Sequence, residues 1–181
     1  MTTNQDEQEE ITYRTSRTDR AGLRAGILEA RELIAQVTDG IDTATLENEI
    51  IAGKWTARDI VGHLADWDRR TRSGIRHALD GTDPGELVVD DFDPLNGQMV
   101  AARRARGDRW EDVTRDLDSW LAATLALLDG VSEAQLSLPA SLPWGRMTTL
   151  LDVFGVFEFH VEEHHADLAI LQSLTEAATV R

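Results

Sequence analysis

The chain has 181 residues, of which 41% are hydrophobic and 28% charged, a composition typical of one globular domain. It contains no cysteine, so disulfides, thiolate zinc sites and cysteine nucleophiles are excluded. The 33 acidic and 18 basic residues give a net charge of −15, so we expect no nucleic acid partner and no membrane partner. The chain has neither an apolar run of roughly 18 residues nor a signal-peptide pattern at its start, which predicts a cytoplasmic protein.

The two ends of the chain differ in composition from its middle. Residues 1–12 are polar and acidic and are predicted to form a disordered tail. Residues 175–181 are predicted to form a flexible carboxy-terminal tail. The folded domain is therefore expected over residues 13–174.

Apolar residues recur at helical spacing in the first half of this domain. From about 18 to 37 they predict an amphipathic helix, and they are Leu23, Ile27, Ile34 and Val37. A second helix is expected to begin after Thr56, which can form a capping box with Asp59, and to run to about Leu79.

The second half of the domain contains two further helical regions. Residues 80–94 hold prolines, glycines and acidic residues, which predicts a loop. Helical spacing over 95–106 and 110–128 predicts one bent helix or two collinear helices, and a last helix is expected from Thr149 to about Ser173. Few segments alternate with period two, so no sheet is implied. These elements predict an all-α fold, a four-helix bundle with long loops between its helices.

A pair of histidines in the last predicted helix has the spacing of metal ligands. His160 and His164 are four residues apart, so both stand on one helix face. Such a pair also occurs by chance on solvated helices, and the surrounding glutamates favour that alternative. HVEEH also matches the inverted zincin signature, with Glu163 as the general base. Only 17 residues follow His164, so we expect the third ligand to lie upstream instead.

Two histidines upstream are candidates for that third ligand. His63 shares a predicted inward face with Ile60 and Trp67, whereas His77 lies near the end of its helix beside arginines. His63 is therefore the better candidate. A lone histidine on an apolar face is otherwise more often a satisfied core residue, and the inward-facing pair elsewhere reverses that preference.

Other side chains near these histidines are candidates for chemistry or substrate contact. Asp167 shares the face of the histidine pair and could orient a ligand or accept a proton, while Glu163 is rotated by about 100° from His164. Both are candidate catalytic residues. Trp67, one turn beyond His63, and Asn96, just after the acidic loop, are candidate substrate contacts, with core packing and a helix-start role as their structural alternatives.

Three segments together carry a family resemblance. KWTARDIVGHLADW, WGRMTTLL and HVEEHHADL resemble the DinB-like four-helix-bundle superfamily, and the likeness extends from about 20 to 172. The resemblance implies a divalent metal, typically zinc or nickel, held by His63, His160 and His164. Three imidazoles leave a coordination position open, as in catalytic sites. A homodimer is also common among such proteins.

Two branches of the superfamily are similar to this chain. Mycothiol-dependent maleylpyruvate isomerases share the second histidine and Asp167, but carry a glutamate at the place of His160 and an additional carboxy-terminal domain. The colibactin self-resistance hydrolases share the pattern of Trp55, Asp59, His63, Leu64 and Trp67. The resemblance implies mycothiol or another low-molecular-weight thiol as a further cofactor.

These observations predict a metal-binding bundle that transfers a low-molecular-weight thiol to a small electrophile or hydrolyses it, as in detoxification or self-resistance. A metal held by three histidines would supply a nucleophile, as an activated water or a thiolate. The alternative is a binding or sequestering protein of the same fold, in which the metal is structural or absent.

Overall fold

The computed structural model describes residues 13–89 and 91–179, without the side chains of 86 and 174–179. The predicted tail over 1–12 lies outside the described residues. The last helix continues to Thr179, beyond its expected end near Ser173. The elements in chain order are α1 (Arg20–Thr38), α2 (Thr43–Asn48), β1 (Ile50–Ala52), β2 (Trp55–Thr56), α3 (Ala57–Asp80), η1 (Gly85–Leu87), α4 (Phe92–Arg106), α5 (Trp110–Asp129), η2 (Gln135–Ser137), β3 (Pro139–Ser141), β4 (Met147–Thr149) and α6 (Leu150–Thr179).

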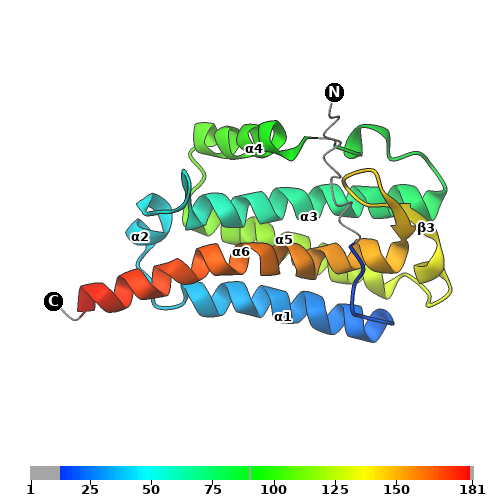
Figure 1. Ribbon diagram of the computed structural model, residues 1–181, viewed down its shortest axis with the longest axis horizontal. Helices are drawn as coiled ribbons and strands as arrows, with labels where there is room; N and C mark the ends of the chain where they lie inside the picture. Colours follow the sequence, from blue (N-terminus) through cyan, green and yellow to red (C-terminus); the bar gives the residue numbers. More distant parts are fainter. Residues whose placement is uncertain (1–12, 90, 180–181) are drawn as a thin grey trace, which may run out of the picture.

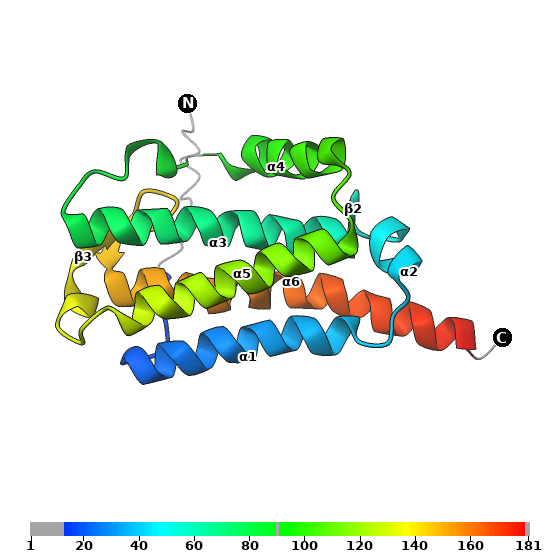
Figure 2. The same cartoon turned by 180° about the vertical axis from the view of Figure 1, so that it is seen from behind.

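Four long helices, α1, α3, α5 and α6, form the bundle, which confirms the predicted fold (Figure 1). α1 packs chiefly against α6, and α3 packs chiefly against α5. Within each of these pairs the two helices run in the same direction, and the two pairs run in opposite directions (Figures 1 and 2). Because α3 and α5 are parallel, the chain between them must return along the bundle, and it does so through α4.

The helices α4 and α5 are separate and antiparallel, so the prediction of one bent or two collinear helices is wrong. α4 ends at Arg106 and is capped by Gly107, whose φ of 74° is in the left-handed region that glycine adopts without steric cost. The chain turns back there, and α4 lies on the outside of α3 as a fifth helix (Figure 1). Arg103 of α4 holds it in place through hydrogen bonds to Asp66 of α3, at 2.8 and 3.0 Å.

Two short antiparallel hairpins, β1–β2 and β3–β4, were not predicted. Each strand has only two or three residues, which is too short to show a period of two. β2 leads directly into α3, and β4 leads directly into α6. The hairpins therefore hold the beginnings of the two helices that carry the histidines.

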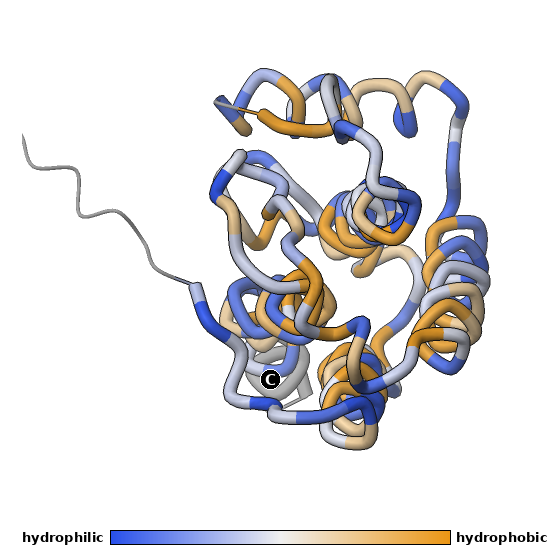
Figure 3. The backbone as a smooth tube through the Cα atoms, turned by 90° about the vertical axis from the view of Figure 1, so that its right-hand side faces the viewer, coloured by the Kyte–Doolittle hydropathy of each residue, from blue (hydrophilic) through white to orange (hydrophobic). Residues whose placement is uncertain are grey.

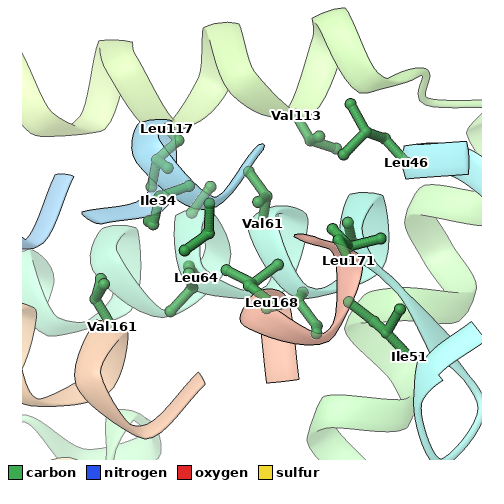
Figure 4. Close-up of a cluster of buried hydrophobic side chains, with 14 of the residues drawn as sticks. Ile34, Leu46, Ile51, Val61, Leu64, Val113, Leu117, Val161, Leu168 and Leu171 are labelled. Carbon is green, nitrogen blue, oxygen red and sulfur yellow. The ribbon is translucent and has the colours of Figure 1, made fainter. Parts of the chain in front are cut away.

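The buried apolar residues of the bundle form two clusters. Hydrophobic positions gather on the helix sides that face one another (Figure 3). One cluster lies where α2 and the β1–β2 hairpin meet the bundle, and Figure 4 shows side chains from six elements converging there. It includes Ile34, Leu46, Ile51, Val61, Leu64, Val113, Leu117, Val161, Leu168 and Leu171. Full burial of one such side chain contributes roughly 1.5–3 kcal/mol, so this contact fixes how α3 and α6 face each other.

None of the helices in the described part of the chain is both long and apolar enough to cross a membrane.

Candidate metal centre

The start of α3 places His63 on the inner side of the helix. Thr56 caps α3 by accepting from the Asp59 backbone N–H at 3.3 Å, and Asp59 accepts from the Thr56 backbone N–H at 3.0 Å, which confirms the predicted capping box. Asp59 also receives a hydrogen bond from Arg104 of α4 at 2.6 Å. His63 follows about one turn later and is only 2% exposed.

α6 carries His160 and His164 on the face that meets α3. One nitrogen of each of the three imidazoles lies within 4.8 Å of the others. The Nε2 atoms of His63 and His160 are 3.0 Å apart, and the ring centroid of His164 lies 5.1 Å from that of each of the other two. His160 and His164 are partly exposed, whereas His63 is buried. Solvent therefore reaches the cluster beside His160 and His164, which we call its open side.

The surroundings keep these imidazoles neutral. Burial lowers the pKa of His63 to about 3, and the nearby charge of His164 adds to this effect. Burial also lowers the pKa values of His160 and His164. A neutral imidazole is the form that binds a metal, so the centre is ready to accept a cation at neutral pH.

The three residues fit a divalent metal. Ligand nitrogens about 2.0–2.1 Å from zinc at tetrahedral angles lie about 3.3 Å from one another. The 3.0 Å separation of two Nε2 atoms is close to that value, and the 4.8 Å limit for the whole set requires only small side-chain movements. Three nitrogen ligands, no thiolate and an open side are typical of catalytic zinc sites.

The two predicted substrate contacts, Trp67 and Asn96, lie together beside the histidines. Trp67 Nε1 donates a hydrogen bond to Asn96 Oδ1 at 2.8 Å. The Trp67 ring lies 6.3 Å from that of His63 and 6.4 Å from that of His160, in an edge-on arrangement. The Arg70 guanidinium lies over the indole ring, with Cζ 5.9 Å from its centroid.

The two candidate catalytic carboxylates differ in position. Asp167 Oδ2 lies 3.6 Å from His164 Nδ1, which is an ion-pair distance and too long for a hydrogen bond. His164 Nδ1 is buried and has no hydrogen-bond partner among the described residues. Glu163 is exposed, and no hydrogen bond or ion pair within the described part of the chain includes it.

The structure adds Trp55 and separates His77 from the centre. The Trp55 ring lies 4.9 Å from that of His63 and 6.4 Å from that of His164, so it forms one wall of the site. Its position eight residues before His63 could have indicated a place in the site. The sequence did not predict β2, the strand that turns Trp55 inward. His77 contacts Thr82 at the far end of α3, with Nδ1 and Oγ1 2.8 Å apart.

A family model matches most of the chain, from α1 to α6. The model of the DinB superfamily matches residues 27–168. The chain belongs to the DinB superfamily. This match confirms the resemblance inferred from the sequence. No curated protein matches the chain in sequence.

Solved structures share the DinB fold of this chain at low sequence identity. The colibactin self-resistance protein ClbS, in complex with dsDNA, has a TM-score of 0.70 and 14% identity, covering 88% of this chain and 98% of its own. YfiT from Bacillus subtilis, described as a probable metal-dependent hydrolase with an unusual four-helix bundle topology, has a TM-score of 0.69 and 18% identity, covering 90% and 91%. DfsB, described as a sibling lethal factor precursor, has a TM-score of 0.67 and 16% identity, covering 88% and 98%.

The expectation of no nucleic acid partner is wrong. It came from the net charge of −15, yet ClbS, which has the same fold, was crystallised in complex with dsDNA. A net charge sums over the whole surface, whereas contacts with phosphates depend on local groups. The charge of this DinB chain therefore does not exclude a nucleic acid partner.

Proposed function

We propose that this protein is a metal-dependent enzyme that acts on a small electrophilic molecule, by hydrolysis or by transfer of a low-molecular-weight thiol such as mycothiol. The observation that carries the proposal is the open cluster of His63, His160 and His164, whose ligand atoms lie within 4.8 Å of one another. The description of YfiT as a probable metal-dependent hydrolase supports it.

The three histidines would hold zinc or nickel, and a divalent cation there supplies a Lewis acid that activates a water or a thiol as nucleophile. His63 anchors the site from the buried side, while His160 and His164 border the open side. The substrate would enter from that open side, because His63 is 2% exposed.

The neighbouring side chains have separate proposed roles. Asp167 acts as a positioning residue for His164, because a small movement from 3.6 Å would let it accept a hydrogen bond from Nδ1. Trp67, oriented by its hydrogen bond to Asn96, forms a wall of the substrate site. Glu163 is exposed, so it would exchange protons with solvent at the rim.

The test measures metal content and turnover in the same samples. Untagged protein expressed with zinc and nickel present is analysed by mass spectrometry, as wild type, His63→Ala and the control His165→Ala. We expect about one metal per chain in the wild type and control, and a loss of more than about tenfold in His63→Ala. Less than a tenth of an equivalent in the wild type would overturn the metal-dependent function.

Sequestration without turnover is the second candidate, and the description of ClbS as a self-resistance protein favours it. Turnover is measured with epoxide, quinone and activated ester substrates, each with water alone and with mycothiol. Retained metal and tight binding with no turnover in either condition would favour sequestration over catalysis.

A further inference from the structure

Aromatic side chains form a continuous row of ring contacts that begins at Trp67, beside the histidines. The ring centroids of Trp67 and Phe92 are 5.3 Å apart, and those of Phe92 and Trp144 are 6.3 Å apart. Trp144 lies 6.4 Å from Tyr13, and Tyr13 lies 4.7 Å from Phe159, which precedes His160. These five residues, the aromatic row, come from α3, α4, the β3–β4 turn, the segment before α1, and α6.

Four residues of the aromatic row differ from the aromatic residues of the core. On α6, Phe154 and Phe157 are 0% and 5% exposed and belong to the apolar interior. Phe159, two residues further along, is turned outward and is partly exposed, as are Tyr13, Phe92 and Trp144. Trp67 is buried, with 6% exposed, and forms the inner end of the row, while Tyr13 and Trp144 also pack against the second apolar cluster. Core packing alone does not require four partly exposed rings from four separate segments to meet beside a candidate metal centre.

The segment before α1 is fixed in a position that adds Tyr13 to the row. Asp152, 3% exposed, accepts a hydrogen bond from the Thr15 backbone N–H at 3.1 Å and from Arg14 Nη1 at 3.0 Å. Gly155 permits the approach, because a Cβ atom there would lie 2.6 Å from the Tyr13 hydroxyl oxygen. Tyr13 is thus held against α6 before any ligand arrives, which lowers the entropic cost of binding.

The chemistry that this row offers is ring surface. The polar edge of Trp67 is satisfied by Asn96 and the residue is 6% exposed, so the accessible ring surface belongs to the other four residues. Burial raises the pKa of the Tyr13 hydroxyl, and the carboxylates of Glu158 and Glu162 add to the rise. An anionic ligand would meet these carboxylates at the Tyr13 end of the row.

We infer that the aromatic row binds a flat, conjugated, non-anionic molecule by ring stacking and presents one end of it to the histidines. This inference rests on the proposed function for the reaction at that end, and it names the substrate class. Stacked or edge-on aromatic pairs contribute about 0.5–1.5 kcal/mol beyond their buried area, which corresponds to about a 2- to 13-fold gain in affinity per pair.

The test compares a flat probe with a saturated one of the same carbon skeleton. Zinc-loaded full-length protein is titrated with 2-naphthylmethanol, its decahydro counterpart and 2-naphthoate by isothermal titration calorimetry. We expect 2-naphthylmethanol to bind about three- to tenfold more tightly than the decahydro compound, and more tightly than the anion. Equal affinities for the flat and saturated probes would overturn the inference.

Variants locate the binding on the aromatic row. Phe92→Leu and Trp144→Leu are expected to weaken 2-naphthylmethanol binding about three- to tenfold and to change decahydro binding by less than about twofold. Trp110→Leu is the matched control, because Trp110 is a partly buried tryptophan that packs against the first apolar cluster and is not part of the row. A loss in the control as large as that in Trp144→Leu would refute the assignment.

Metal content measured in the same samples keeps this inference separate from the proposed function. If protein that retains one metal per chain binds the flat and saturated probes equally, only the proposed substrate class is wrong. If the wild type holds less than a tenth of an equivalent of metal but still prefers the flat probe, ligand binding by the aromatic row is supported and the metal-dependent function is wrong.

Discussion

His63 Nε2 and His160 Nε2 lie 3.0 Å apart across the interface of α3 and α6, although 97 residues separate them in the chain. With His164 they bring three neutral imidazoles together at one point of the bundle. Metal binding should therefore stabilise the fold, because the ligands belong to two different helices.

Zinc should raise the unfolding temperature of the wild type and of His165→Ala, but not that of His63→Ala. At free zinc about 100 times the dissociation constant, the expected stabilisation is about 2.7 kcal/mol. Differential scanning calorimetry with and without chelator measures it. An equal shift in His63→Ala would show that the metal binds elsewhere.

The metal-free protein should lose stability as pH falls from 7 to 5. The folded pKa of His63 is about 3, while the unfolded value is about 6.5, so only the unfolded chain takes up this proton in that range. The stabilising contribution is present above about pH 6.5 and is lost below it. The free energy of unfolding, measured with urea at several pH values, should depend less steeply on pH in His63→Gln, by up to about 1.4 kcal/mol per pH unit. Identical slopes would contradict the buried neutral state of His63.

Asp167→Asn should weaken zinc binding about 10- to 100-fold, as the loss of a group that orients a metal-bound histidine does elsewhere. Asp167 Oδ2 lies 3.6 Å from His164 Nδ1, whereas exposed Glu163 makes no hydrogen bond or ion pair with a histidine among the described residues. Glu163→Gln is the matched control, with an expected change below about threefold. Competition with a zinc chelator gives both constants, and equal effects would remove the positioning role of Asp167.

Two glycines of α3 should respond oppositely to alanine. At Gly62 a Cβ atom would lie 2.7 Å from Arg103 Cδ and 3.2 Å from Val113 Cγ1, so Gly62→Ala should destabilise the protein by about 1–3 kcal/mol. Gly74 has nothing within 4 Å of such an atom, and Gly74→Ala should stabilise it by about 0.5–1 kcal/mol. Urea unfolding measures both. A neutral Gly62→Ala would mean that α4 is not held closely on α3.

Asp68→Asn should stabilise the protein at pH 8 by roughly 1–3 kcal/mol. Burial raises the pKa of Asp68 to about 7, although the charge of Arg72 partly offsets this rise. Between about pH 4 and 7 the unfolded chain releases this proton and the folded chain keeps it, so the wild type becomes less stable as pH rises. The advantage of the variant should therefore vanish near pH 4. A pH-independent difference would point to packing and not to the carboxyl charge.

The local parts of the structure were predictable from the sequence. Helical spacing gave the approximate ranges of α1, α3, α5 and α6, and the capping box of Thr56 and Asp59 gave the start of α3. The shared face of His160 and His164 followed from their spacing of four residues. Each of these features depends on residues within a few turns of one another, where the geometry of the helix alone sets the relationship.

The contacts between segments that lie far apart in the chain were decided only by the tertiary structure. The reversal at Gly107 places α4 outside the bundle, which brings Asn96 onto Trp67 and Arg103 onto Asp66. The same packing turns Trp55 toward His63 and assembles the aromatic row from five segments. Such contacts depend on how apolar faces pack and where loops reverse the chain, and the periodicity of one helix carries no information on either. The histidine pair was thus determined by the sequence of α6, while its enclosure by aromatic rings was decided by the fold.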